Sequence, residues 1–283
     1  MHRERLRNQT GAVRQDVSRN GLTKSAAIIR CIRIDPRDPI VLTPRFHCAE
    51  PIPKTPGAEF ILRGTVVQHM QVLRLSAGDA LALFDGQGGE VAAKLLQLGK
   101  REAVVHVDAH HDLERESPLA VTLVQALATG DKMDAIVQKA VELGAVAIQP
   151  ISTQRATVKL SSERALQRRE HWQAVAIAAC EQCGRNRIPV IHPVLSFDQW
   201  LATPAPGLRA LLHPEAGATL EALRANSTLE LAVGPEGGFS PEEVTAARHA
   251  RALVVAAGPR VLRTETAGMA LLAALNAQAG DFR

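Results

Sequence analysis

The sequence predicts two folded parts, a small β-rich part followed by a larger α/β part with a parallel sheet. Short apolar runs of β type lie between residues 43 and 116, whereas from residue 119 apolar runs alternate with stretches of helical periodicity. Such alternation is typical of βαβ units whose parallel sheet carries helices on both faces. The chain has 283 residues, 46% of them apolar, so each part is long enough to bury a core.

Residues 1–42 differ from the rest in charge and pattern. They contain nine Lys and Arg against four Asp and Glu, a net charge of +5, while the other 241 residues carry a net charge of −1. They show no sustained period of 2 or 3.6 residues, and we expect a basic, disordered extension. A plain tail, a start codon placed too early, and an arm that contacts RNA all remain open. Overall basicity therefore gives no argument for nucleic-acid binding by the folded parts.

The β-rich part, residues 43–116, should form a small sheet or barrel. We expect strands at 45–48, 80–85, 90–98 and 103–109 and one helix at 64–75. Gly86, Gly88 and Gly89 resemble part of a nucleotide loop, but a strand and not a helix follows them. We interpret them as a hairpin turn. The acidic, Pro-containing segment 111–118 is the expected linker.

The α/β part, residues 119–283, should alternate strands and helices. Strands are expected at 120–127, 145–151, 188–191, 208–213, 229–234 and 252–257. Helices are expected at 131–144, 161–183, 196–202, 219–225, 241–250 and 265–279. Ser240, Pro241, Glu242 and Glu243 supply an N-cap, a first-turn proline and acidic groups near the positive end of the helix dipole. The start of this helix, at Pro241, is the best-defined element boundary in the chain.

Composition excludes several classes of protein. No apolar run approaches the roughly 20 residues of a membrane-spanning helix, and no signal segment follows the basic N-terminus, so a cytoplasmic protein is expected. The four cysteines are too few for a disulfide framework. Cys180 and Cys183 supply at most two of four zinc ligands, so we expect no metal. Aromatic residues make up 3% of the chain, which argues against a surface that stacks many nucleobases.

Two glycine-bearing loops near the C-terminus mark a candidate binding cleft. GPEGGFS (234–240) and GPRVLRTETA (258–267) each follow a predicted strand directly. Ligands bind at the carboxyl ends of strands in open α/β sheets, and glycine lets the backbone approach a ligand closely. Each loop alone could be only a tight strand-to-helix turn, but two on consecutive strands favour a shared pocket. Neither has the pattern of a P-loop or of a dinucleotide-binding fingerprint.

Four motifs in order resemble one known family. KMDAIVQKAVELGA (132–145), EQCGRNRIP (181–189), GPEGGFS and GPRVLRTETA are similar to those of the small-subunit ribosomal RNA uridine-N3 methyltransferases of the SPOUT class. The resemblance runs from about Thr43 to the C-terminus. Cys183 stands where a small polar residue is expected, and residues 1–42 have no counterpart in the family, which puts their place in the protein in doubt.

The resemblance implies a fold, a cofactor and an assembly. It implies a PUA-like, RNA-binding β-domain at 43–116 and a trefoil-knot (SPOUT) methyltransferase domain at 119–283, a kind of threading that no periodicity reveals. It further implies a homodimer that binds S-adenosylmethionine and acts on 16S ribosomal RNA or the small ribosomal subunit. The positions implied to contact the methyl donor are Leu211, Leu212, His213, Gly234, Pro235, Glu236, Gly237, Gly238, Gly258, Val261, Leu262, Arg263, Thr264, Thr266 and Ala267.

Methylation at uridine N3 requires the loss of a proton from that nitrogen. A base must remove the proton or a cation must stabilise the uracil anion. Arg263, on the donor-binding loop, is the candidate cation, and Glu236 and Glu265 are the candidate bases. The alternatives are that a Glu at a helix start is a cap and that Arg263 pairs with Glu265.

RNA must be held by basic groups. Residues 155–187 carry a net charge of +4, a patch that could neutralise phosphates, although a solvated helix face is the alternative. His69 could equally be a core histidine. The RNA-binding candidates are Arg45, His69, Arg74, Lys132, Arg155, Arg168, Arg169 and Arg185. Other functions left open are methylation of a ribose 2′-hydroxyl, methylation of transfer RNA, and a non-catalytic RNA-binding assembly factor.

Overall fold

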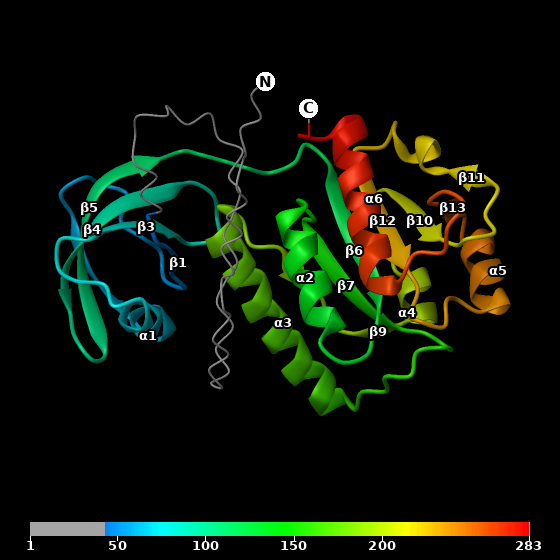
Figure 1. Cartoon of the computed structure of the whole chain (residues 1–283), viewed down its shortest axis with the longest axis horizontal. Coiled ribbons are helices and arrows are strands. Elements are labelled where there is room, and N and C mark those ends of the chain that lie inside the picture. The colour runs from blue at the N-terminus through cyan, green and yellow to red at the C-terminus, as the bar shows by residue number, and fades with distance from the viewer. Residues whose placement is uncertain (1–42, 283) are drawn as a thin grey trace, which may run out of the picture. The chain divides into compact units, whose positions relative to one another are not determined.

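The computed structural model describes residues 43–282 (Figure 1), and the expectation for residues 1–42 lies outside them. Two sheets are present in this range, one of five strands in the order β1-β3-β4-β5-β2 and one built around seven strands in the order β11-β13-β10-β12-β6-β7-β8. The first belongs to the β-rich part and the second to the α/β part. None of the helices within 43–282 combines the length and the hydropathy needed to cross a bilayer.

The five-stranded sheet packs its inner face against a single helix. Along β3 and β4 buried residues alternate with more exposed ones, as expected for a sheet with one covered face. Val67 and Met70 of the helix pack against Leu81, Leu83 and Leu95 of the strands. The elements are β1 (Arg45–His47), β2 (Glu59–Arg63), α1 (Thr65–Val72), β3 (Ala80–Phe84), β4 (Glu90–Leu98) and β5 (Glu102–His111).

The glycine-rich turn between β3 and β4 is the expected hairpin. Gly86, Gly88 and Gly89 all have positive φ, and the two strands pair antiparallel. Strand β2 was not expected from the sequence. Only Leu62 of its five residues is buried, so the apolar alternation that identifies a strand is missing, and its pairing with β5 defines it instead.

The larger sheet is parallel throughout, as expected. Adjacent pairs such as β12 with β6 and β10 with β13 run in the same direction. Its strands are β6 (Ala120–Ala126), β7 (Ala147–Ser152), β8 (Val190–Ile191), β9 (Leu195–Ser196), β10 (Leu208–Leu212), β11 (Ala218–Thr219), β12 (Thr228–Val233) and β13 (Leu253–Ala256). Its helices are α2 (Lys132–Glu142), α3 (Ser162–Cys183), α4 (Phe197–Ala202), α5 (Pro241–His249) and α6 (Thr264–Ala279).

Helices cover both faces of this sheet. Helices α2, α3 and α6 share one apolar cluster with Val121 and Leu123 of β6, and α4 and α5 share another with Val124 and Ala126 of the same strand. Neighbouring residues of β6 therefore point to opposite layers, as the pleat requires. Figure 1 shows α2 and α6 lying across one face of the central strands. The helix expected at 219–225 is instead the short strand β11 followed by a 3₁₀ turn at Leu220–Leu223, with only Leu223 of that turn buried.

Candidate functional site

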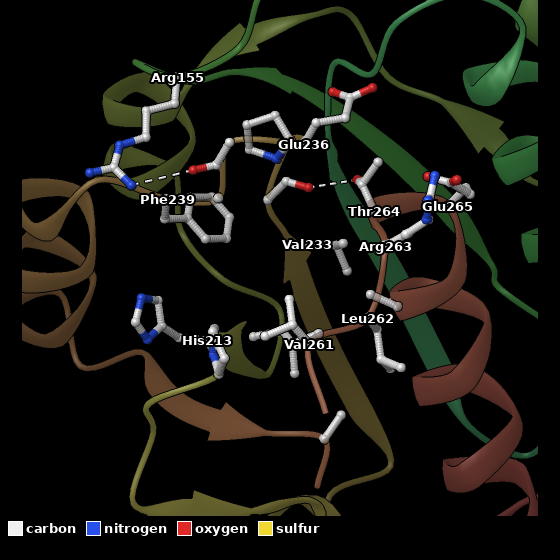
Figure 2. Close-up of a pocket in the computed structure, with 18 of the residues that line it drawn as sticks. Arg155, His213, Val233, Glu236, Phe239, Val261, Leu262, Arg263, Thr264 and Glu265 are labelled. Carbon is white, nitrogen blue, oxygen red and sulfur yellow. Dashed lines mark hydrogen bonds between the residues drawn. The ribbon is translucent and has the colours of Figure 1, made fainter. Parts of the chain in front are cut away.

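A cavity of about 520 Å³ opens where β10, β12 and β13 end. These three strands are neighbours and run parallel, so their following loops meet at one edge of the sheet. The two glycine-bearing loops and the end of β10 therefore line the same cavity (Figure 2). In α/β sheets this edge is where a ligand can touch several backbone segments at once.

Most residues implied to contact a methyl donor line this cavity. The structure brings together Leu212, His213, Gly234, Pro235, Glu236, Gly237, Gly238, Gly258, Val261, Leu262, Arg263, Thr264 and Ala267. Two of the implied positions do not line it. Leu211 is fully buried in the core between the sheet and α4 and α5, and Thr266 lies on the exposed side of the first turn of α6. Glu265, named only as a candidate base, also lines the cavity.

The loop glycines leave space that a side chain would occupy. Gly238 and Gly258 have φ of +69° and +84°, and a Cβ built at either would meet no atom within 4 Å. Both therefore adopt a backbone region that disfavours other residues and expose a flat edge of main chain. Gly237 differs, because a Cβ there would lie 3.1 Å from Cβ of Arg155, so it faces protein. A ligand group could therefore approach the main chain closely at Gly238 and Gly258.

A buried hydrogen-bond relay joins the two loops. The Thr264 hydroxyl donates to the carbonyl oxygen of Gly234 at 2.6 Å and accepts from the Gln125 Nε2 at 2.9 Å. Gln125 is fully buried on β6, and its amide also donates to the Ala126 carbonyl. The first residue of α6 is thereby fixed to the first glycine of the loop after β12. We expect this relay to set the width of the cavity between them.

Glu236 is tied to the start of α2. Its Oε1 accepts from Lys132 Nζ at 2.8 Å and from the hydroxyl and amide of Thr129 at 2.7 and 3.1 Å. Desolvation opposes ionisation, but these hydrogen bonds outweigh it and lower the pKa of Glu236 to about 2. The hydrogen bond to Glu236 in turn raises the pKa of Lys132. A carboxylate with so low a pKa is a weak base, so the structure favours an anchoring role for Glu236.

Arg263 and Glu265 flank Thr264, the first residue of α6, in sequence, and both are labelled in Figure 2. The Arg263 guanidinium is exposed and forms no hydrogen bond or ion pair with other residues in 43–282. Glu265 pairs instead with Lys132, at 3.8 Å from its Nζ, so the possible Arg263–Glu265 pair does not form. The Glu265 Oε2 is buried with no hydrogen-bond partner in the described chain. Two exposed lining guanidinium groups, those of Arg260 and Arg263, thus have no partner within 43–282 and can act on a ligand, and the Glu265 carboxylate lies beside them with Lys132 as its nearest cation.

The first turn of α5 fixes the far wall of the cavity. Ser240 and Glu243 form a capping box in which each side chain accepts from the other residue's backbone amide, as the sequence indicated. The second oxygen of Glu243 accepts from the Gln154 amide at 2.8 Å. This contact holds the loop after β7 in place, and Arg155 from that loop donates to the Gly237 carbonyl at 3.3 Å.

Two RNA-binding candidates, Arg45 and Arg185, are buried. Arg45 pairs with Glu90 and donates to the Asn186 side chain at 2.6 Å. Arg185 pairs with Glu116 and donates to the carbonyl oxygens of Val141 and Ala145. Buried charges need such partners, and the side chains of Arg45 and Arg185 are only 6% and 4% exposed. The structure therefore places both groups in buried contacts between the five-stranded sheet and the α/β part, and we expect a structural role for them.

The other candidates keep access to solvent. Lys132 and Arg155 line the cavity, which sequence reasoning did not foresee. Arg74 is exposed after α1, and Arg168 is exposed on α3, whereas Arg169 is half-buried and donates to the Ile191 carbonyl. His69 is 46% exposed and lies 3.5 Å from Glu181, so it is not a core histidine.

Several lining residues were missed by the sequence reasoning. Phe239 and Arg260 lie inside the two glycine motifs and could have been found there, whereas Pro214, Val233 and Ala257 only extend strand ends already named. Cys180 and Cys183 are free thiols whose pKa values burial raises. Within 43–282 no three residues of metal-ligand type form a cluster.

Comparison with known proteins connects this geometry to a family. The family model described as RNA methyltransferase domain matches residues 115–276, and the RNA methyltransferase PUA domain matches residues 62–108. Ribosomal RNA small subunit methyltransferase E of Bacillus subtilis is 32% identical over 230 residues, which cover 77% of this chain and 90% of the relative. Ribosomal RNA small subunit methyltransferase E of Synechocystis is 35% identical over 216 residues, which cover 73% of this chain and 69% of the relative.

Solved structures agree with the sequence matches. Ribosomal RNA small subunit methyltransferase E from Neisseria gonorrhoeae, bound to S-adenosylmethionine, is 36% identical and has a TM-score of 0.79, covering 85% of this chain and all of its own. Lpg2936 of Legionella pneumophila, solved with the cofactor SAM, is 36% identical with a TM-score of 0.80 and covers 86% of this chain and all of its own. The expected PUA-like and SPOUT domains are thus confirmed. The chain belongs to the RNA methyltransferase family that includes ribosomal RNA small subunit methyltransferase E.

Proposed function

We propose that this protein transfers a methyl group from S-adenosylmethionine to N3 of a uridine in 16S ribosomal RNA. The observation that carries the proposal is the convergence of two glycine-bearing loops on one cavity beside Arg263 and Glu265. The family and the SAM-bound relatives support the cofactor and the class of RNA.

The residues present fit S-adenosylmethionine. The open backbone edges at Gly238 and Gly258 suit an adenine and a ribose, and apolar side chains of Val233, Leu262 and Phe239 line the same space. Bound there, the cofactor would supply a methyl group already activated by its sulfonium. The protein must then align acceptor and donor and exclude water.

The remaining chemistry belongs to Arg263 and Glu265. The methyl–sulfur bond breaks as the N3–methyl bond forms, and the N3 proton must leave the uracil. The Glu265 carboxylate is the acceptor that we assign to this proton, because it lines the cavity, is 27% exposed and accepts no hydrogen bond within 43–282, its contact with Lys132 being a longer ion pair of 3.8 Å. Arg263 would stabilise the negative charge on the uracil oxygens as the proton departs. Glu236 would hold the loop through Lys132 and Thr129.

Two experiments test this function. Calorimetric titration with S-adenosylmethionine should give saturable heat, and its absence at high concentration would leave only an RNA-binding assembly factor. Mass spectrometry of nucleosides from 16S RNA should show 3-methyluridine lost in a deletion strain and restored by the gene. Unchanged 3-methyluridine with loss of a ribose 2′-O-methyl or of a transfer RNA methyl group would replace the proposed substrate.

We further propose a cytoplasmic homodimer that forms through the α/β domain. The support is membership of the family, for which the resemblance implies this assembly. Light scattering on the protein as it elutes from a size-exclusion column should give twice the mass of one chain. A monomer that is fully active would remove the dimer from the proposal.

A further inference from the structure

A second cavity, of about 420 Å³, adjoins the first. The two share Arg155, His213, Pro214 and Phe239, so these residues form a common wall. Beyond the shared wall, the second cavity is lined by Glu215, Pro241, Val244, Thr245 and Arg248. It thus extends from the site described above along the outer side of α5.

The second cavity combines an apolar floor with arginines. Phe239 and Val244 are buried and form part of the floor, with Pro214 and Pro241 beside them. Arg248, on the last turn of α5, is exposed, and its guanidinium forms no hydrogen bond or ion pair with another residue in 43–282. Arg155 donates to a single carbonyl, that of Gly237. Both guanidinium groups therefore keep most of their donors for a ligand.

Acidic groups near this cavity are few. Glu215 is the acidic lining residue, and its backbone amide donates to Nδ1 of His213 at 3.3 Å. Glu242, on the first turn of α5, lies near Arg155 and is exposed to solvent. Glu243 is buried and already used by Ser240 and Gln154. The free donors of Arg155 and Arg248 therefore favour an anion.

We propose that the second cavity binds a nucleotide flanking the target uridine, with its phosphate held by Arg155 and Arg248. This inference rests on the proposed function, because it takes RNA as the substrate. A uridine inside a polymer cannot enter the first cavity without bringing its neighbours to the rim. Guanidinium groups match phosphate oxygens in geometry and charge, and an apolar floor suits a ribose or a base.

The methyl donor itself does not account for this cavity. The glycine edges that suit its flat groups, at Gly238 and Gly258, line the first cavity only. Beyond the shared wall, the second cavity is lined instead by residues of α5 and by Glu215 of the loop after β10. Contacts of this kind position a backbone without reading its sequence.

A pair of charge-removing variants tests the inference. Arg248→Gln removes a guanidinium that lines the cavity, and Arg251→Gln removes one that is exposed three residues later and lines neither cavity. The substrate is small ribosomal subunits from a strain lacking the gene. For Arg248→Gln we expect KM for the subunit to rise about tenfold, with kcat and the SAM dissociation constant unchanged. Arg251→Gln should change KM less than twofold, and Arg248→Lys should recover part of the loss.

The salt dependence gives a second readout. One lost phosphate contact should lower the slope of log KM against log salt concentration by roughly 0.7 to 0.9 in Arg248→Gln. If wild type is active and Arg248→Gln keeps its KM and slope, the second site is wrong. If Arg248→Gln weakens SAM binding instead, the cavity belongs to the donor. A wild type that methylates no uridine N3 overturns the proposed function, whatever the variants do.

Discussion

At the scale of single residues, the structure distinguishes the anchoring role of one glutamate from the proton-accepting role of another. The sequence alone could not tell which was which. Glu236 and Glu265 were equal candidates for a base, since each lies in a glycine motif near a helix start. In the structure Glu236 has three hydrogen-bond donors on one oxygen, whereas Glu265 Oε2 has none in the described chain. Hydrogen bonds to the ionised form weaken a base, so the proton-accepting role passes to Glu265.

Arg263 should act on the reaction more than on binding. Its guanidinium lines the cavity without a protein partner in 43–282, so Arg263→Ala removes charge stabilisation from the transition state and leaves the glycine edges intact. We expect kcat to fall about 10²- to 10³-fold, with the SAM dissociation constant changed less than threefold. Single-turnover rates and calorimetry measure the two quantities. Equal losses in both would move Arg263 to cofactor binding, and Arg263→Lys is the charge-retaining control.

Glu236 should make stability depend on pH in the acidic range. Its folded pKa of about 2 lies below the ordinary value of 4.5, so its ionised form stabilises the fold. That contribution is fully present above pH 4.5 and is lost as the pH falls toward 2. Urea unfolding should show Glu236→Gln less stable than wild type at pH 7, with a smaller difference at pH 3.

Glu221→Gln is the matched control for this measurement. Glu221 pairs with Arg224 at 3.4 Å, but both side chains are more than 60% exposed, and such pairs contribute little. Its effect should be small at both pH values. A difference for Glu236→Gln that stays constant from pH 7 to pH 3 would contradict the lowered pKa.

At the scale of elements, those with a complete local signal in the sequence were predicted correctly. Those with an incomplete signal were missed or assigned to the wrong type. Helix α5 begins at Pro241 as expected, because cap, first-turn proline and capping-box Glu all lie within four residues. Strand β2 was missed because one inward residue in five gives no period. The 3₁₀ turn at Leu220–Leu223 was mistaken for a helix because four residues cannot show whether the period is 3.0 or 3.6.

The residues of the candidate site also fall into those that the sequence predicted and those that it did not. Contiguous motifs identified the glycine loops, Arg263 and Thr264, which follow strands that the pattern located. Arg155 lies 82 residues before its partner Gly237 and Lys132 lies 104 residues before its partner Glu236, and only the parallel order of the strands brings them to the cavity. A single sequence carries no signal for such contacts.

Thr264 connects two elements, and its hydroxyl should therefore be needed for cofactor binding. Thr264→Val removes the donor to the part-buried Gly234 carbonyl and the acceptor of one of the two hydrogen bonds from the buried Gln125 amide, at a cost of about 1 to 3 kcal/mol. Thr264→Ser keeps the hydroxyl and is the control. We expect Thr264→Val to lower the unfolding midpoint and to weaken SAM binding about tenfold or more, while Thr264→Ser stays within about threefold.

Two outcomes would contradict the expected role of the Thr264 hydroxyl in cofactor binding. If calorimetry finds that Thr264→Val and Thr264→Ser bind SAM equally well, the relay does not set the width of the cavity. If only stability falls in Thr264→Val, the hydroxyl supports the fold alone.

At the scale of the whole molecule, counting charges could not separate arginines that hold the protein together from arginines left for RNA. Residues 155–187 form a basic segment by composition, yet Arg185 is buried within it and Arg168 is exposed. Arg115 and Arg45 share the Glu90 carboxylate, and Arg45 reaches Asn186 beside Arg185. The buried network therefore spans from β1 to the segment after α3 and uses its positive charge internally.

The difference between buried and exposed arginines predicts opposite effects on stability and on RNA binding for two substitutions that each remove one charge. Arg185→Ala leaves Glu116 unpaired and removes one of the two donors to the Val141 carbonyl and the side-chain donor to the Ala145 carbonyl, so we expect a loss of about 3 to 5 kcal/mol in the free energy of unfolding. Arg168→Ala should change stability by less than about 0.5 kcal/mol. Because Arg168 is exposed, its loss should instead weaken RNA binding and make that binding less sensitive to salt. Urea unfolding and RNA titrations at two salt concentrations distinguish the pair, and an Arg185→Ala variant that folds normally but loses RNA affinity would return Arg185 to the RNA-binding surface.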